Sequence, residues 1–203
     1  MEKKNTLAYT IIAILVLLVA VIGATFAYFQ AQLGSGASAS VSVTTQTTDS
    51  LTFNAANITV GPVTQANFGS GSGNKSSSGN ASVVLTANNT ASSTYCYTAG
   101  LTITANNFVY TVNSSTPELT ITATKNSTTV LQNRDITTTS TGTINFPTAL
   151  NGSTTKHTIT ASAGNTTTDS WVVTVTFINL NSDQQNNTGK TFTGNVVFTK
   201  VNC

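Results

Sequence analysis

Two hydrophobic patterns divide this chain of 203 residues. Residues 7–29 form one continuous apolar run without a charged side chain. From residue 37 onward, apolar residues instead tend to alternate with Ser, Thr and Asn. A long apolar run is typical of a membrane-spanning or signal helix, whereas a period of two places alternate side chains on one face of a β-strand. The patterns therefore predict one N-terminal helix followed by β-structure.

The apolar run is long enough to cross a bilayer. Its 23 residues, at about 1.5 Å each, span roughly 34 Å, and the hydrocarbon core is about 30 Å thick. Lys3 and Lys4 precede the run, and such basic residues are retained on the cytoplasmic side. We expect residues 1–29 to be a signal peptide or a transmembrane anchor that contacts the membrane through residues 7–29. The remainder of the chain is then extracellular or displayed at the cell surface.

The sequence leaves the fate of this helix open. Cleavage between Ala27 and Tyr28 is favoured by the small residue at position −1 and by Thr25 at position −3. Gly23 also favours cleavage, because glycine loosens the helix where a peptidase needs extended backbone. Retention as an anchor is favoured by the length of the run, which exceeds the roughly 7–15 apolar residues of an ordinary signal peptide.

Residues 30–50 are predicted to be a flexible segment that contains one candidate strand. The segment begins with a Gly- and Ser-containing spacer. Small apolar residues then alternate strictly with serine, so that all of them share one face of an extended chain. The residues on this face are Ala37, Ala39, Val41 and Val43.

Residues 51–203 are predicted to form one all-β domain. Alternation marks eight or more short strands, at 83–85, 101–105, 108–112, 119–124, 144–146, 156–162, 170–179 and 192–201. In the strongest of these, one face carries Trp171, Val173, Val175 and Phe177. Asn151-Gly152 predicts a two-residue hairpin turn, because both residue types tolerate positive φ. Many short strands separated by turn residues are typical of an antiparallel β-sandwich or jelly roll.

Two short segments carry a resemblance to a known family. GATFAYF at residues 23–29 resembles the end of the long signal peptides that SipW-type signal peptidases process. NSDQQNNTGKTF at residues 181–192 is similar to the Asp-Gln-Asn-rich turn of the TasA and camelysin group of bacterial and archaeal surface-fibre proteins. The resemblance implies fibre assembly by donor-strand exchange, in which Ala37–Val43 of one copy would complete a sheet edge of another. The alternative is that this strand pairs within its own domain.

Charged side chains are scarce. They make up 7% of the chain, compared with about 25% in a typical soluble protein. Beyond residue 29, six Lys or Arg residues oppose five Asp or Glu residues. Because no basic stripe is present to neutralise phosphates, the composition argues against nucleic-acid binding. A surface of hydroxyls and amides also lacks like-charge repulsion between copies, which suits self-association.

Candidate chemistry is sparse. His157 is the only histidine, and the chain has neither an HExxH nor a CxxC motif, so it lacks the ligand set of a zinc site. Camelysin has been described as a metalloprotease, and that activity is therefore not expected here. The five carboxylates show no recognisable pairing. We interpret His157 as an exposed structural residue, and we expect no metal, no cofactor and no enzymatic activity.

Cys96 and Cys203 are the only two cysteines. An even number in an exported chain permits a single disulfide between them, and two free thiols are the alternative.

Taken as a set, the patterns favour a non-enzymatic structural protein of the cell surface or extracellular matrix that associates with copies of itself. The alternative is a membrane-anchored adhesin that binds glycans or a host protein through its loops.

Overall fold

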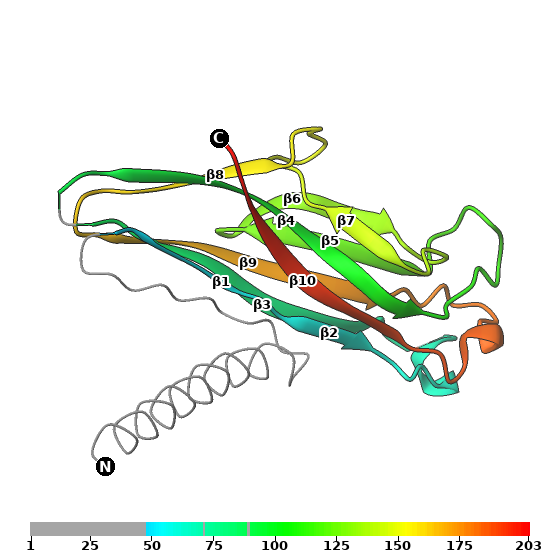
Figure 1. The fold of residues 1–203 in the computed structure, drawn as a ribbon. Coiled ribbons are helices and arrows are strands. Elements are labelled where there is room, and N and C mark those ends of the chain that lie inside the picture. The colour runs from blue at the N-terminus through cyan, green and yellow to red at the C-terminus, as the bar shows by residue number, and fades with distance from the viewer. Residues whose placement is uncertain (1–47, 71, 89) are drawn as a thin grey trace, which may run out of the picture. The chain divides into compact units, whose positions relative to one another are not determined.

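The computed structural model describes residues 48–203, apart from residues 71 and 89. This part of the chain is all-β, with ten strands in two antiparallel sheets (Figure 1). The strands are β1 (Ser50–Asn54), β2 (Asn57–Val60), β3 (Lys75–Thr86), β4 (Ser93–Asn106), β5 (Leu119–Lys125), β6 (Thr128–Asp135), β7 (Gly142–Asn145), β8 (Lys156–Ala161), β9 (Thr166–Phe177) and β10 (Phe192–Val201). Two short 3-10 helices are η1 (Gln65–Asn67) and η2 (Gln185–Asn187). Neither of these described helices has the length and apolar character needed to cross a membrane.

Several predicted features lie outside the described residues. They are the signal peptide or anchor of residues 1–29, its cleavage site at Ala27 and Tyr28, and the candidate strand with Ala37, Ala39, Val41 and Val43. The first described strand, β1, begins at Ser50, which is the last residue of the segment 30–50.

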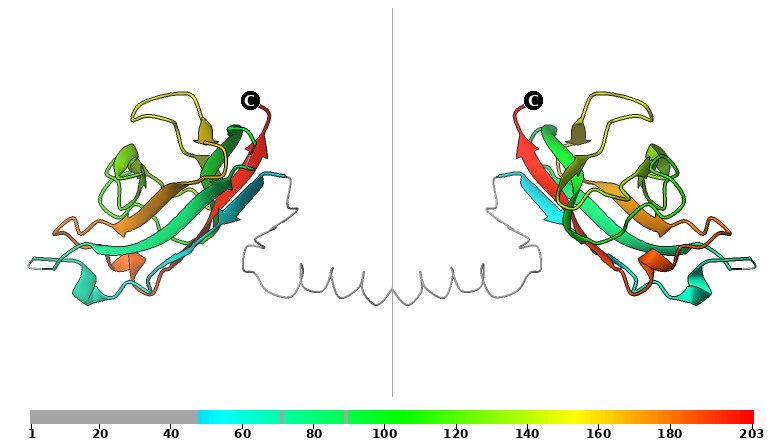
Figure 2. Two further views of the ribbon diagram at one scale, coloured as in Figure 1. Left: turned by 90° about the vertical axis from the view of Figure 1, so that its left-hand side faces the viewer. Right: turned by 90° about the vertical axis from the view of Figure 1, so that its right-hand side faces the viewer.

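The strands form two layers, which we call sheet A and sheet B (Figures 1 and 2). Sheet A has the order β1-β3-β9-β5-β6, and sheet B has the order β2-β10-β4-β7, with β8 also paired to β4. The chain crosses from sheet A to sheet B between β1 and β2, through Ala55 and Ala56. The predicted all-β class with antiparallel sheets is confirmed.

The core lies between the sheets and follows the alternation of the sequence. Trp171, Val173, Val175 and Phe177 on β9 are each at most 1% exposed, so the predicted buried face of this strand is confirmed. The inward residues of β3, β4, β5 and β10 complete the same apolar cluster. Burying one large apolar side chain contributes about 1.5–3 kcal/mol, so this cluster is the main source of stability.

The outer faces of the sheets are polar but nearly uncharged. The outward positions of β3 and β9 carry only Ser, Thr, Asn and Val. Hydroxyl groups pair across neighbouring strands: Ser78 contacts Thr174 at 2.7 Å on sheet A, and Thr102 contacts Thr143 at 2.8 Å on sheet B. Such pairs stabilise a sheet by roughly 0.2–1 kcal/mol each. The alternating threonines and serines thus give a wettable surface without charge.

The predicted strand from Phe108 to Val112 is wrong, because this segment is a loop between β4 and β5. Its backbone bonds to side chains rather than to a partner strand. The N–H groups of Phe108 and Val109 donate to the side-chain oxygens of Asn106 and Asn187, at 3.1 and 3.0 Å. Side-chain amides therefore satisfy the backbone that the alternation had suggested would enter a sheet.

The predicted hairpin at Asn151-Gly152 is also wrong. Asn151 has a φ of 62°, and the N–H of Gly152 donates to Ala149, so a turn does occur there. However, β7 and β8 do not pair with each other. Both pair with β4, over Gly100–Ile103 and Ser93–Thr98 respectively. The 14-residue β4 is long enough to hold both strands in succession, and residues 146–155 leave this edge as a loop and return to it.

A buried carboxylate fastens the loops at one end of the domain. Glu118 is 0% exposed, and its Oε2 accepts hydrogen bonds from the side-chain amides of Gln184 and Asn187 at 2.8 Å each. Its Oε1 accepts hydrogen bonds from the backbone N–H and the hydroxyl of Thr111. Four donors therefore solvate this carboxylate in place of water. We call these four residues the Glu118 cluster.

Candidate assembly edge and surface pocket

Strand β10 is paired along its full length on one side only. On that side β4 pairs with every residue from Phe192 to Val201. On the other side β2 pairs only with Phe192–Asn195, and the last backbone bond there runs from the N–H of Val196 to the carbonyl of Ala56. Within the described part of the chain, no strand pairs with this outer edge between residues 197 and 201. We call this segment the open edge of β10.

Backbone geometry shows which groups face the open edge. The N–H and C=O of successive residues in a strand point to opposite sides. Because the N–H of Val196 points toward β2, the backbone groups of Phe198 and Lys200 also point outward, whereas those of Thr199 point toward β4. An added strand would therefore bond to Phe198 and Lys200.

Apolar side chains lie beside the open edge. Phe53 on β1 and Phe198 on β10 are both only half-buried, and their rings stack with centroids 5.8 Å apart. Leu51 is half-buried on the same strand as Phe53 and also packs against the core. The strand edge and its apolar neighbours together form a site of the kind to which a further strand with one apolar face can add.

The described chain begins close to this edge. The carboxylate of Asp49 accepts hydrogen bonds from the backbone N–H of Asn88 at 3.0 Å and from the hydroxyl of Tyr95 at 3.2 Å. Hydrogen bonds from Ser93 and Asn88 lower the pKa of the Asp49 carboxyl group. The ammonium of Lys200, near the end of β10, lies 4.3 Å from the centre of the Tyr95 ring. Tyr95 therefore brings the start of β1 to the end of β10.

A disulfide joins Cys96 and Cys203 in the structure, with their Cα atoms 5.1 Å apart. This is the pairing that the sequence permitted. Cys96 lies opposite Val201 in the register of β4 and β10, so the bond fastens the end of β10 to β4. The bond closes a loop across 107 residues of sequence, which contributes about 4–5 kcal/mol in the chain-entropy description.

His157 is buried, not exposed as we expected. It is 2% exposed, stacks on Tyr97 with ring centroids 5.4 Å apart, and meets the edge of Trp171. Its Nε2–H donates to the backbone carbonyl of Phe146 at 3.1 Å. Burial lowers the pKa of this imidazole. Residue 157 has the same parity as the buried Ile159, and this alternation could have placed it inside.

The buried acid beside these rings is fully paired. Asp169 accepts a hydrogen bond from the Tyr97 hydroxyl at 2.7 Å and one from the side chain of Asn126 at 2.9 Å, and it forms an ion pair with Lys125 at 2.8 Å. Burial raises the pKa of the Tyr97 hydroxyl. These contacts fix strands β4, β5 and β9 to one another, and both carboxylate oxygens of Asp169 have partners.

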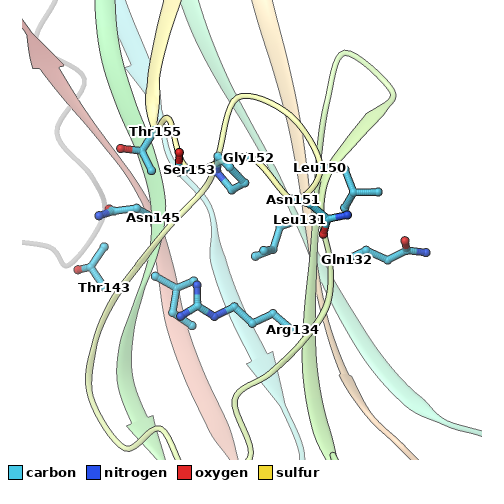
Figure 3. A pocket seen from close by; sticks show the side chains of 12 residues that line it. Leu131, Gln132, Arg134, Thr143, Asn145, Leu150, Asn151, Gly152, Ser153 and Thr155 are labelled. Carbon is cyan, nitrogen blue, oxygen red and sulfur yellow. The ribbon is translucent and has the colours of Figure 1, made fainter.

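A surface pocket lies between the edge strands β6 and β7, on the side of the domain away from the open edge of β10. It has a volume of about 410 Å³ and includes residues of the loop between β7 and β8. Figure 3 shows the side chain of Arg134 extending across the pocket from β6 toward the β7 residues. Leu131 and Ile144 supply apolar surface, and the exposed Leu150 stands at the rim. We call this site the Arg134 pocket.

Most polar side chains of the Arg134 pocket have no partner within the described chain, and the exception is the hydroxyl of Thr143, which pairs with Thr102. No hydrogen bond or ion pair involves the guanidinium of Arg134 or the side chains of Asn145, Asn151 and Ser153 in that part of the protein. In another loop, by contrast, the side-chain oxygen of Asn113 accepts a hydrogen bond from the backbone N–H of Ser115 at 2.9 Å. No local sequence pattern indicates this site, because its residues come from separate strands and one long loop.

Within the described residues, no group of three or more His, Cys, Asp or Glu side chains is arranged to hold a metal ion. A search of protein families finds no matching family model, and a search of curated proteins finds no match.

Proposed function

We propose that this protein is a non-enzymatic structural protein of the cell surface or extracellular matrix that assembles with copies of itself. Residues 7–29 carry it to the membrane, as a cleaved signal peptide or a retained anchor, and the β-domain acts outside the cell. The observation that carries the proposal is the open edge of β10, which lies next to the half-buried Phe53 and Phe198.

The proposed donor is the segment Ala37–Val43 of a neighbouring copy. Its four small apolar side chains suit a face that must pack over the rings of Phe53 and Phe198. The open edge from Val197 to Val201 is about 17 Å long, at about 3.4 Å per residue, so a seven-residue donor covers it. The backbone groups of Phe198 and Lys200 would then bond to the added strand.

Strand direction favours a neighbouring copy over the same chain. β1 leads into β2, which is antiparallel to β10. A segment that folded back from β1 onto β10 of its own domain would run parallel to β10. Every pairing in the described sheets is antiparallel, and a separate copy can add a strand in that direction. The nearly uncharged outer faces allow such copies to approach with little repulsion.

Deleting residues 30–45 tests this proposal. We expect electron microscopy to show polymers of the intact protein, whereas the deletion should leave only a folded monomer. A finer pair of variants separates the two faces of the donor. Val41→Asp with Val43→Asp should abolish polymers, because charge is placed on the packing face, whereas Ser40→Asp with Ser42→Asp should not. Unchanged polymers after the deletion would refute donor-strand assembly.

An adhesin is the second candidate, and the Arg134 pocket is the observation that favours it. In this case the helix of residues 7–29 is retained and the loops bind a ligand. N-terminal sequencing of cell-associated protein separates the candidates: retention of residues 1–27 favours the anchored adhesin, and a new N-terminus near Tyr28 favours the released, assembling form.

A further inference from the structure

The Arg134 pocket combines a cavity of ligand size with unused binding groups. Its volume of about 410 Å³ falls within the roughly 300–1,000 Å³ that is usual for small-molecule sites. Arg134 has no acidic partner, since the ion pair of the described chain is formed by Lys125 and Asp169. A guanidinium presents a rigid fork of donors that matches a carboxylate in a bidentate arrangement. The pocket therefore favours an anion, and a planar carboxylate can pair with both arms of the guanidinium at once.

The loop that frames the pocket is held in place before any ligand arrives. Phe146 at its base is 0% exposed, and its ring stacks on Trp171 with centroids 5.6 Å apart. The N–H of Phe146 donates to Ala99 at 2.8 Å, and its carbonyl accepts from His157. Further along the loop, the N–H of Thr148 donates to Thr154 at 2.7 Å. A pre-formed loop loses little conformational entropy on binding.

The remaining lining indicates what bears the carboxylate. Asn145, Asn151 and Ser153 are exposed and offer both donors and acceptors, while Leu131 and Ile144 give a small apolar floor. A sugar ring presents hydroxyls around its rim and C–H groups on its faces, which fits such a lining. Among the described residues, no aromatic side chain lines the pocket, so a neutral sugar would lack the ring stacking that commonly holds it. Charge is then the main source of affinity.

We propose that the Arg134 pocket binds a carboxylate-bearing saccharide of the uronic-acid class, with the guanidinium of Arg134 paired to the sugar carboxylate. This site is separate from the open edge of β10, so the saccharide can bind whether or not copies assemble. In an extracellular matrix, such binding would join the protein to an acidic polysaccharide.

Calorimetric titration of the detergent-solubilised full chain tests the proposal. The probes are a galacturonic-acid trisaccharide, the neutral galactose trisaccharide, and a short peptide with a free C-terminal carboxylate. We expect the uronate to bind, and Arg134→Gln to weaken its binding about tenfold or more. The matched control is Lys190→Gln, which removes one positive charge outside the pocket and should leave the affinity unchanged.

Several results would overturn the proposal. They are no uronate binding at about millimolar concentration, equal binding of the neutral trisaccharide, or equal loss in the Lys190→Gln variant. Binding of the peptide without the uronate would assign the pocket to a protein partner instead. Because Arg134 is exposed, the Arg134→Gln variant should have the same unfolding temperature as the wild-type protein. A thermal unfolding measurement therefore checks that any loss of binding does not come from a loss of folding. Electron microscopy of the same variant reports assembly independently, so failure here is distinguishable from failure of donor-strand assembly.

Discussion

The Glu118 cluster and the Arg134 pocket use similar side chains in opposite ways. Both contain amide side chains and one charged group. In the cluster, the amides of Gln184 and Asn187 point at the Glu118 carboxylate, and all of these groups are buried and paired. In the pocket, the amide of Asn145 and the guanidinium of Arg134 have no partner among the described residues.

The polar groups of the Glu118 cluster stabilise the fold, whereas those of the Arg134 pocket remain free to bind another molecule. A buried donor without a partner is costly, so the cluster must be complete within one chain. An exposed donor is satisfied by water, so a chain can leave it free for another molecule. The open edge of β10 belongs with the pocket, because the outward backbone groups of Phe198 and Lys200 likewise have no strand partner in the described part of the chain.

The largest effect is expected from Glu118→Ala. The substitution removes one of the two acceptors of each side-chain amide of Gln184 and Asn187, and also the acceptor of the Thr111 backbone N–H. One N–H of each of these groups is then left unpaired. We expect the free energy of unfolding to fall by about 3 kcal/mol or more. Chemical denaturation followed by the fluorescence of Trp171 measures it.

Asp183→Ala is the control for this variant. Asp183 lies in the same loop but is exposed, and its carboxylate accepts one hydrogen bond, from the N–H of Gln185 at 2.9 Å. We expect a loss below about 1 kcal/mol. An equal loss of unfolding free energy in the two variants would show that the stability depends on the loop in general and not on the buried carboxylate of Glu118.

The sequence predicted the all-β class and the shared face of β9, because the alternation along a strand is local information. The alternation that placed Trp171 and Val175 on one face is a period of two, and any half-buried strand shows it. The same rule, applied to His157 and Ile159, would have placed the histidine inside. We interpreted it by residue type instead of by position, and that was the error.

The sequence could not predict the features that depend on distant partners. Phe108 has the pattern of a strand residue, but the side-chain oxygen of Asn106 takes its backbone N–H. In the sequence, nothing distinguishes Glu118 from an ordinary surface acid. Its partners Gln184 and Asn187 lie in a loop more than 60 positions further along the chain. The Arg134 pocket requires β6 and β7 to become neighbouring edges, which no local pattern specifies.

An intermediate effect is expected from His157→Phe, and it depends on pH. Burial holds the pKa of His157 below its usual 6.5, so the unfolded chain binds more protons than the folded chain once the pH falls below about 6.5. The wild-type protein should therefore lose stability as the pH falls from about 6.5 to 5. Phe keeps the stacking but leaves the carbonyl of Phe146 without its donor, which costs about 1–2 kcal/mol at neutral pH.

Urea denaturation at several pH values separates the two contributions of His157. The variant should start less stable but show a flat profile between about pH 6.5 and 5. Asp49 and Asp135 both have a pKa below the usual 3.8. The protein therefore loses the stability that these two carboxylates contribute only at a pH below the range measured for His157. A wild-type slope that persists in the variant would assign the proton uptake to another group.

The smallest effect on stability is expected from Lys200→Pro, and the same change should abolish assembly. The N–H of residue 200 points to the open edge, so proline removes a donor that the isolated domain does not use. We expect a loss of less than about 1 kcal/mol, from the contact between Lys200 and the ring of Tyr95. Lys200→Gln loses that contact but keeps the N–H, and it should still form polymers. Thr199→Pro removes a bond to β4 instead and should destabilise the domain itself by at least about 1 kcal/mol. If the Lys200→Pro variant formed polymers like those of the wild-type protein, copies would not join at this edge.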